Sequence, residues 1–436
     1  MRNRRRTPGV AALLATAAVL AACTSTAPAP DPTTPPPTQP PTLPPAEPEP
    51  VTLTWWHATE DEELDAHRQW VADEFEAAHP HVTVQIVGVR ADSPRPAADS
   101  LPDVVDVSDA VWLADLVAQD GVRDLTEDLA PEIALLGATA SAYQVGGRSY
   151  ALPWSFEGFG LWYNPDVFAQ AGIGQVPTTL DELLGVVGTL RAAGVTPIAA
   201  NLSDGFTGDR FWEELAVRTC PSAAWPDPGR APRFDDPCFQ AAGAALERLI
   251  AAGAFDPDAA GTPGGPTDAH ALVATGQAAM VLSGTWAPTL MASGLEASGL
   301  APESLGEPGW FPFPADAGAP GDPTTVVGDA RALAVAADAP PEAVELVRAV
   351  VGRDAQTRQA GTTSWSPVDA DAAAAAPAHA QPMLAAVHSA QQARLTVQYV
   401  YGGDVSLALY GAVTDVFHGR GSAQDLVDAL NAAGAG

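Results

Sequence analysis

The feature that most constrains the fold is a succession of strand, helix and strand near the start of the sequence. Residues 51–56 alternate and are rich in β-forming side chains, and residues 82–86 alternate again. Between them, residues 64–78 place apolar side chains at helical spacing before Pro80. This order predicts a β-α-β unit, which requires a parallel sheet. The sequence therefore predicts an α/β fold, and residues 101–107 supply a third short strand.

The ends of these strands select the first candidate site residues, because ligands of open α/β sheets bind at the carboxyl ends of strands. His57 follows the first strand, and Asp106 lies at the end of the third. We expect both to bind a ligand, although a plain loop residue is the alternative for His57. Trp55 and Trp56 point to opposite faces of their strand, so we expect only one of them to face a cleft.

Residues 150–168 concentrate aromatic side chains around one carboxylate, Glu157. Flat rings beside an acidic group suit a polyol, because its C–H faces stack on the rings while its hydroxyls donate to the carboxylate. Trp154 and Glu157 are therefore candidate ligand-binding residues. The alternative is an aromatic corner of the core.

Two further stretches combine small, polar and aromatic residues. Residues 272–286 hold a predicted strand that ends in Ser-Gly-Thr-Trp. Gly284 would let a ligand approach the backbone there, and Trp286 would provide a stacking surface. Residues 201–212 indicate a polar loop in which Asp209 and Trp212 are candidates to face a cleft. A plain surface loop is the equal alternative for that stretch.

The acidity of the chain excludes several classes of function. The formal net charge is −32, and all 21 basic residues are arginine. Such a chain does not bind nucleic acid by neutralising phosphates, and it disfavours anionic ligands. The sequence has no phosphate-binding loop and no Cys-x-x-Cys pair, and its eight histidines are scattered. We therefore expect no cofactor, no metal site and no nucleic-acid partner.

The first residues have the layout of a bacterial export signal. Arginines precede an apolar run of 14 residues, 9–22, which is too short to span a bilayer. The Leu-Ala-Ala-Cys of residues 20–23 resembles the lipobox of bacterial lipoproteins, whose cysteine carries the lipid. An ordinary cleaved signal is the alternative, and export by the twin-arginine route stays open. We expect residues 1–22 to be removed, which leaves Cys23 lipidated and a net charge of −32 − 4 = −36.

Residues 24–50 hold twelve prolines and no basic residue. Such a segment favours extended polyproline II and would reach at most about 80 Å. We expect residues 23–50 to tether a body to the outer face of the bacterial cell membrane. Cys220 and Cys238 are the other cysteines, and in an exported protein we expect them to form a disulfide that contributes about 3 kcal/mol.

Several motifs occur in the order seen in one protein family. Residues 150–168 resemble the segment that crosses between the lobes of the extracellular solute-binding proteins of ABC importers. The similarity is to the sugar-binding branch related to maltose-binding protein. The Gly-Gln-Ala-Ala-Met and Ser-Gly-Thr-Trp of residues 276–286 are similar to that family's signature, and the resemblance spans most of residues 51–355.

This resemblance implies a fold and a domain organisation. The expected fold is an α/β, two-lobe, periplasmic-binding-protein-like type II fold with a hinge and a ligand cleft between the lobes. The first lobe would comprise residues 51–156 and 322–354. The second would comprise residues 157–321 and 355–436.

The resemblance also adds three candidate ligand-binding residues. Residues 326–331 are similar to the family's returning strand and turn, where two glycines are common. This chain has Gly328 followed by Asp329, so the side chains of Asp329 and Arg331 become candidates. Relatives offer an aromatic residue to the cleft from their C-terminal part, and Trp365 is the candidate here.

The function implied by the resemblance is transport rather than catalysis. The chain would capture a mono- or oligosaccharide and deliver it to the permease of an importer, whose ATPase subunit completes the assembly. We expect a monomer that is not an enzyme. The alternatives are a sensing lipoprotein for a signalling receptor, a binder of a non-sugar solute, and a cell-surface glycosidase that uses Glu157 with Asp106.

Overall fold

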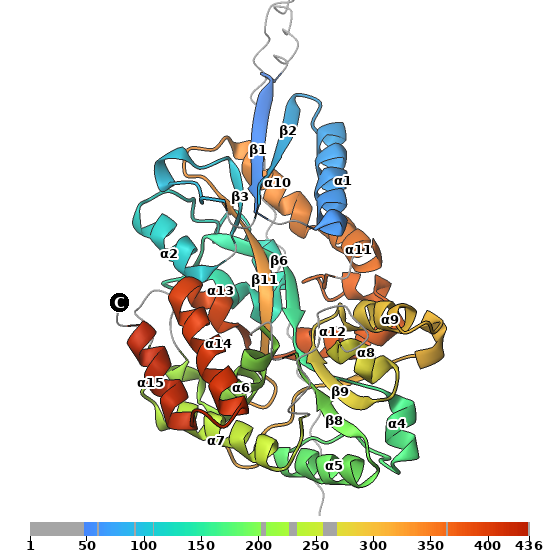
Figure 1. Cartoon of the computed structure of the whole chain (residues 1–436). Coiled ribbons are helices and arrows are strands. Elements are labelled where there is room, and N and C mark those ends of the chain that lie inside the picture. The colour runs from blue at the N-terminus through green and yellow to red at the C-terminus, as the bar shows by residue number, and fades with distance from the viewer. Residues whose placement is uncertain are drawn as a thin grey trace, which may run out of the picture. The chain divides into compact units, whose positions relative to one another are not determined.

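The computed structural model of the chain describes residues 48–58, 61–90, 93–107, 109–201, 206–225, 233–255, 268–362 and 365–434. The described residues from Glu49 onward belong to one unit (Figure 1). The unit Met1–Pro48 lies almost wholly outside the described residues. Cys23, the predicted export signal and most of the proline-rich tether therefore lie outside them as well.

The first sheet contains the predicted β-α-β unit. Its strand order is β12-β11-β3-β1-β2, and β6 pairs with β11. The strands are β1 (Val51–His57), β2 (Val82–Gly88), β3 (Val104–Val107), β6 (Ala151–Gly158), β11 (Val326–Val335) and β12 (Ala393–Leu395). Both β2 and β3 pair with β1 in parallel, and α1 (Glu62–Ala78) connects β1 to β2. The predicted parallel pairing of these strands is confirmed, but the sheet as a whole is mixed, because β11 pairs antiparallel with β3 and β6.

A core of aliphatic and aromatic side chains packs on this first sheet. Trp55 is fully buried in it, and Trp56 is also buried, meeting Trp112 edge to face with ring centroids 5.7 Å apart. Both tryptophans of β1 are thus core residues, so the expectation that one of them faces a cleft is wrong. The helices that accompany this sheet are α1, α2 (Ala110–Ala118), α3 (Ala130–Leu135), α10 (Pro341–Val351) and α11 (Arg353–Thr362).

The second sheet has the strand order β10-β7-β9-β8. Its strands are β7 (Gly160–Tyr163), β8 (Thr196–Ala199), β9 (Ala278–Ser283) and β10 (Gly309–Phe311). The helices around it are α4 (Pro165–Gln170), α5 (Leu180–Ala192), α6 (Phe206–Thr219), α7 (Pro237–Ala251), α8 (Ala269–Ala274), α9 (Ala287–Ala297), α14 (Gly403–Phe417) and α15 (Ala423–Ala433). Helix α5 begins with a capping box, the sequence pattern of a helix start, formed by Thr179 and Glu182.

The chain passes between the two sheets at Phe159. Strand β6 ends at Gly158 in the first sheet, and β7 begins at Gly160 in the second. The backbone N–H of Phe159 donates to the carbonyl of Val327 on β11 at 3.2 Å, so β6 and β11 lie side by side up to this point (Figure 1). The chain returns from β10 to β11, and later passes from β12 into α13 (Val397–Tyr401), where Val397 joins the core of the second sheet.

One expectation about this crossing is wrong. Gly328 and Asp329 do not form a turn, because they lie inside β11 and pair with Gly158 and Glu157 of β6. A Cβ atom at Gly328 would lie 2.3 Å from the carbonyl oxygen of Glu157. The glycine therefore permits close approach of two strands rather than a reversal of the chain.

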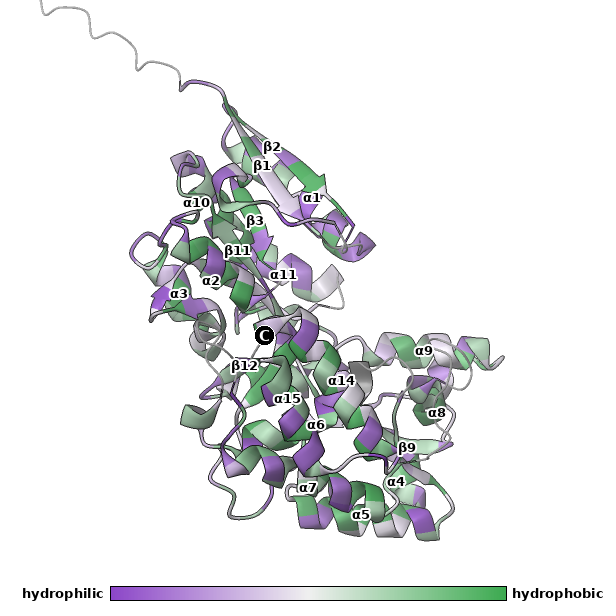
Figure 2. Ribbon diagram, turned by 60° about the vertical axis from the view of Figure 1, so that its left-hand side comes forward, coloured by the Kyte–Doolittle hydropathy of each residue, from purple (hydrophilic) through white to green (hydrophobic). Residues whose placement is uncertain are grey.

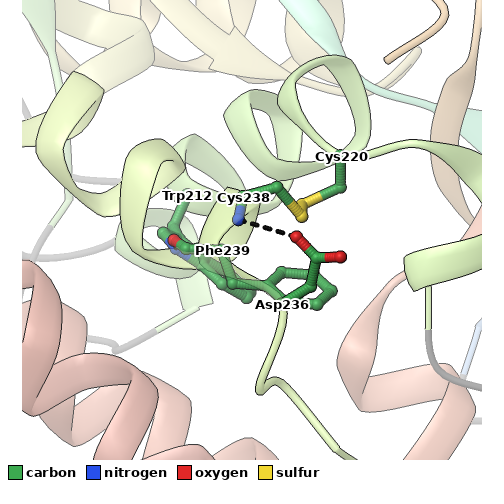
Figure 3. The surroundings of a disulfide bond; sticks show 5 residues. All are labelled: Trp212, Cys220, Asp236, Cys238 and Phe239. Atoms are coloured by element: carbon green, nitrogen blue, oxygen red, sulfur yellow. Dashed lines mark hydrogen bonds between the residues drawn. A yellow bond between two sulfur atoms is a disulfide. The ribbon is translucent and has the colours of Figure 1, made fainter. Parts of the chain in front are cut away.

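The disulfide is present as predicted. Cys220 follows α6 and Cys238 lies in the first turn of α7, and their sulfurs are bonded (Figure 3). Asp236 caps α7 by accepting from the N–H of Cys238 at 3.0 Å. The bond thus fixes α6 to α7 in the core of the second sheet.

The helices carry hydrophilic residues between hydrophobic ones (Figure 2). Within the described part of the chain, no helix has the length and apolar character needed to cross a membrane. The remaining short elements are β4 (Gln144–Val145), β5 (Arg148–Ser149) and α12 (Gln381–Ser389).

Candidate ligand-binding site

A pocket of about 250 Å³ lies where elements from both sheets meet. Glu63 reaches it from the start of α1, beside the first sheet. Thr285 and Thr289 reach it from the segment that follows β9 in the second sheet. The segment after α11 supplies much of the remaining wall, including Trp365, Ser366, His379 and Leu384. The lining is mixed, with hydroxyl, carboxylate, imidazole and indole groups.

Trp365 is held between two charged side chains. The guanidinium of Arg331 lies over its ring, 4.3 Å from the centroid, and its indole Nε1 donates to Asp61 Oδ2 at 2.8 Å. Asp61 also caps α1 by accepting from the N–H groups of Glu63 and Leu64. Two predicted site residues, Arg331 and Trp365, are therefore in contact, and the indole is fixed at the pocket wall.

Glu157 is fully buried at the point where three segments meet. Its carboxylate accepts from the hydroxyl of Thr285, and from the N–H and, at 3.2 Å, the hydroxyl of Ser366. Burial raises the pKa of Glu157 to about 7, although these hydrogen bonds oppose the rise. Both donor residues line the pocket. Glu157 thus links β6 to two pocket walls from behind and does not itself line the pocket.

A second buried cluster lies beside the crossing. Arg210 Nη1 is 2.7 Å from Glu213 Oε2 and 3.1 Å from Asp209 Oδ2, all on α6. Arg210 Nη2 is 3.5 Å from Oδ1 of Asp329 on β11, and the guanidinium lies over the ring of Phe159. Asp329 also accepts from the Thr396 hydroxyl at 2.7 Å. The predicted residues Asp209 and Asp329 are therefore brought together, but by an arginine that the sequence reading did not select.

Three carboxylates share one guanidinium in this cluster. Burial raises the pKa values of Asp209, Glu213 and Asp329, while the charge of Arg210 opposes each rise. Asp209 Oδ1 is buried without a hydrogen-bond partner. The cluster therefore retains protons more readily than exposed carboxylates do.

Three other predicted residues form a network within the first sheet. Asp106 accepts from Arg68 Nη2 at 2.6 Å and from the indole Nε1 of Trp154 at 3.3 Å. Trp154 is fully buried, with Arg68 over one face. His57 is buried too, and its Nε2 lies 3.6 Å from Asp65, which also accepts from Arg68. None of these side chains is among the residues that line the described pocket.

The remaining aromatic candidates occupy different environments. Trp212 is fully buried between Phe234 and Phe239 near the disulfide, and its Nε1 donates to the carbonyl of Phe239 at 3.4 Å (Figure 3). Trp286 is half-buried and meets Phe159 edge to face, with centroids 5.6 Å apart. A Cβ at Gly284 would lie 2.5 Å from the Trp286 ring, so the glycine makes room for this indole.

The sequence reading missed Asp61, Thr285, Ser366 and Arg210. The interpretation of residues 201–212 as a loop is wrong from Phe206 onward, where α6 begins. The charges at positions 209, 210, 213, 214 and 218 have the i,i+3 and i,i+4 spacing of a helix and could have revealed it. Thr285 lies in the Ser-Gly-Thr-Trp motif, from which only its neighbours Gly284 and Trp286 were selected.

Comparison with known proteins finds one matching family and several solved structures of similar fold. Residues 58–357 match the family of bacterial extracellular solute-binding proteins. The fold is similar to a chitin oligosaccharide binding protein, with a TM-score of 0.67 and 23% identity, covering 89% of this chain and 100% of that chain. It is also similar to the sugar-binding protein MalE from the phytopathogen Xanthomonas citri, with a TM-score of 0.72 and 18% identity, covering 87% and 95% of the two chains.

A third similar structure is the GacH receptor of Streptomyces glaucescens, solved unliganded and with acarbose. Its TM-score is 0.61 and its identity 20%, covering 88% of this chain and 97% of that chain. No curated protein sequence matches the chain. The predicted two-lobe α/β fold is confirmed by these likenesses.

Proposed function

Because the chain belongs to the bacterial extracellular solute-binding proteins, we propose that it captures a mono- or oligosaccharide between its two lobes for an ABC importer. The observation that carries this proposal is the pocket of about 250 Å³ walled by residues of helices and loops beside both sheets. An indole at its wall suits the C–H face of a sugar, and the hydroxyl, carboxylate and imidazole groups of the lining suit its hydroxyls.

We assign roles to the residues nearest this pocket. Trp365 is the stacking surface, held in place by Arg331 over one face of its ring and by Asp61 at its Nε1. Thr285 and Ser366 are hydroxyl contacts, and Glu157 fixes both from behind. Gly284 and Trp286 shape the turn that carries Thr285. The other candidates belong to the buried networks described above and are given no ligand contact: His57, Asp106, Trp154, Asp209, Trp212 and Asp329.

The proposed mechanism is closure of two lobes about the strands that cross between them. The lobes are residues 51–156 with 322–354, and residues 157–321 with 355–436. Strand β6, which continues to Gly158, and β12, which pairs in the first sheet, lie across these boundaries. A ligand favours the closed form only to the extent that it binds that form better, so contacts from both lobes are required.

Delivery and anchoring complete the proposal. The closed form would dock on a membrane permease that works with an ATPase subunit. Lipid on Cys23 and the tether of residues 23–50 would hold a monomeric body at the outer face of the cell membrane. The proline-rich composition of the tether supports this arrangement.

The test is thermal unfolding of residues 51–436 against a panel of mono- and oligosaccharides. A sugar at 100 times its dissociation constant should stabilise the chain by about 2.7 kcal/mol. Trp365→Ala should weaken binding about tenfold, because stacking is lost.

Trp70→Ala is the matched control for this test. Trp70 is also half-buried beneath an arginine, with Arg358 4.9 Å from its ring centroid, but it lines a groove on α1 away from this pocket. Its binding should match that of the unmodified chain. Equal loss in both variants would contradict the assigned site, and no shift with any sugar would redirect the proposal to amino acids, peptides and polyamines.

A further inference from the structure

The turn that carries Thr285 and Trp286 is anchored by a chain of hydrogen bonds away from the pocket. This turn follows Ser283, the last residue of β9, which is buried and pairs with Gly160 of β7. The hydroxyl oxygen of Ser283 lies 3.0 Å from Nε2 of His270. His270 lies on α8, so the end of a strand is tied to the start of a helix.

His270 is in turn held by a carboxylate. Its Nδ1 lies 2.9 Å from Asp268 Oδ1, and its backbone N–H donates to the same oxygen at 2.9 Å. Asp268 Oδ2 accepts from Asn201 Nδ2 at 2.7 Å, and Asn201 Oδ1 accepts from the N–H of Ala269 at 3.2 Å. Four side chains therefore form one continuous hydrogen-bond network, which joins the segment after β8, the start of α8 and the end of β9.

The direction of the protons along this chain follows from the carboxylate. Burial alone would raise the pKa of Asp268, but hydrogen bonds from His270 and Asn201 hold that pKa well below its usual range. An ionised carboxylate only accepts, so Nδ1 of His270 carries a proton and donates. In the neutral imidazole Nε2 then accepts from the Ser283 hydroxyl. This is the order of donors found in a Ser-His-Asp triad.

We propose that His270 is a positioning residue, which fixes Ser283 so that the turn of residues 283–286 presents Thr285 to the bound solute. The inference rests on the proposed function of the pocket. Positioning fits better than nucleophilic chemistry, because Ser283 is buried and is not among the residues lining the pocket, whereas Thr285 is. The hydrogen-bond network thus supports this turn at Ser283, while Glu157 holds it at Thr285.

Hydrogen exchange of the mature chain tests this role without any sugar. The reporters are the amides of Ala287 and Leu290, which donate to Gly284 and Trp286 and so depend on the turn. His270→Ala and Ser283→Ala should each speed their exchange about tenfold, because a buried hydrogen-bond partner is lost. Added imidazole should restore slow exchange in His270→Ala but not in Ser283→Ala.

Thr275→Ala is the matched control. Thr275 ends the same helix, α8, and its hydroxyl donates to the carbonyl of Ala271 at 2.8 Å without joining the network of Asn201, Asp268, His270 and Ser283. It should leave the reporters unchanged. A uniform rise in exchange across β8 and β9, with no rescue by imidazole, would reduce His270 to a general structural residue and overturn the proposal. So would covalent labelling of Ser283 by a fluorophosphonate, which would indicate a reactive serine.

Titration with maltotriose, xylotriose and chitotriose separates this proposal from the previous one. If a sugar binds the unmodified chain, the two variants should bind it about tenfold more weakly, with recovery of His270→Ala in imidazole. If none binds, the proposed function fails while the exchange result still stands. Unchanged sugar affinity in a variant whose reporter amides exchange faster would overturn the claim that the hydrogen-bond network presents the turn to the solute.

Discussion

Two buried ion clusters in this molecule differ in their balance of charge. In the first sheet Arg68 faces one buried carboxylate, Asp106, at 2.6 Å, and stacks on Trp154. At the crossing between the sheets Arg210 faces three buried carboxylates. These are Asp209, Glu213 and Asp329. Arg68 also pairs with Asp65, which is largely exposed. The two clusters therefore differ in the number of buried carboxylates that each arginine faces.

The comparison indicates which region responds to its surroundings. A balanced pair inside one sheet acts as a scaffold, since neither charge is left uncompensated. Excess carboxylate beside Phe159 is different, because burial raises the pKa of each acid and favours bound protons. Lobe opening that hydrates these groups would release protons. We therefore expect the Arg210 cluster, rather than the Arg68–Asp106 pair, to couple the protein to pH.

The largest effect should come from removing the arginine of the unbalanced cluster. Arg210→Met should cost about 3–5 kcal/mol of unfolding free energy at pH 8, because buried carboxylates lose their counter-charge. The loss should shrink at pH 5, where these carboxylates take up protons. Urea unfolding at both pH values measures it. Arg68→Met, which strands one buried carboxylate, is the matched variant, and an equal, pH-independent loss in both would break the comparison.

Glu157 should give the chain a slope of stability against pH. Its pKa is about 7 in the folded protein, against 4.5 for an ordinary glutamate, because it is buried. The folded chain keeps a proton that the unfolded chain has lost between these values, so stability falls as pH rises through this window and is level above it. The fall amounts to roughly 3 kcal/mol.

Glu157→Gln should reduce the slope by this amount, because glutamine does not titrate. Unfolding free energies of both proteins, measured from pH 4.5 to 8, give the difference directly. Glu182→Gln, at an exposed capping position, serves as the control and should keep the slope. A variant that retains the full slope would show that another group carries the proton.

The most direct form of the comparison makes the same Asp→Asn substitution in each cluster, with opposite expected effects on the free energy of unfolding. Asp329→Asn should stabilise the chain by about 1 kcal/mol at pH 8, because it removes one of three competing charges while its amide oxygen still accepts from Thr396. Asp106→Asn should destabilise it by about 2 kcal/mol, because Arg68 loses its buried partner. Matched denaturation curves test both, and the same sign in both variants would contradict the account.

The sequence allowed prediction of those elements whose signals are local. The β-α-β unit, the capping box at Thr179 and the pairing of Cys220 with Cys238 all follow from patterns within short stretches. The contact of Arg331 with Trp365 joined two predicted residues but could not be predicted as a contact. It depends on how a strand and a distant loop pack together.

The errors share a physical cause. Spacing along a strand or helix does not reveal what covers each face, so Trp154 and Trp212 were selected although both are fully buried. Gly328 was interpreted as a turn residue, because a glycine required for close strand packing looks the same in sequence. Arg210 was overlooked because its importance comes from Asp329, which is distant along the chain.

The measurement that tests the central claim most directly is a distance across the proposed cleft. Spin labels at Gln69→Cys on α1 and Glu296→Cys on α9 would sit on exposed positions beside the first and second sheets. The account predicts that a sugar that raises the unfolding temperature also shortens this distance, and that in Trp365→Ala the shortening needs about tenfold more sugar. An unchanged distance with that sugar bound would contradict capture by closure between the two lobes.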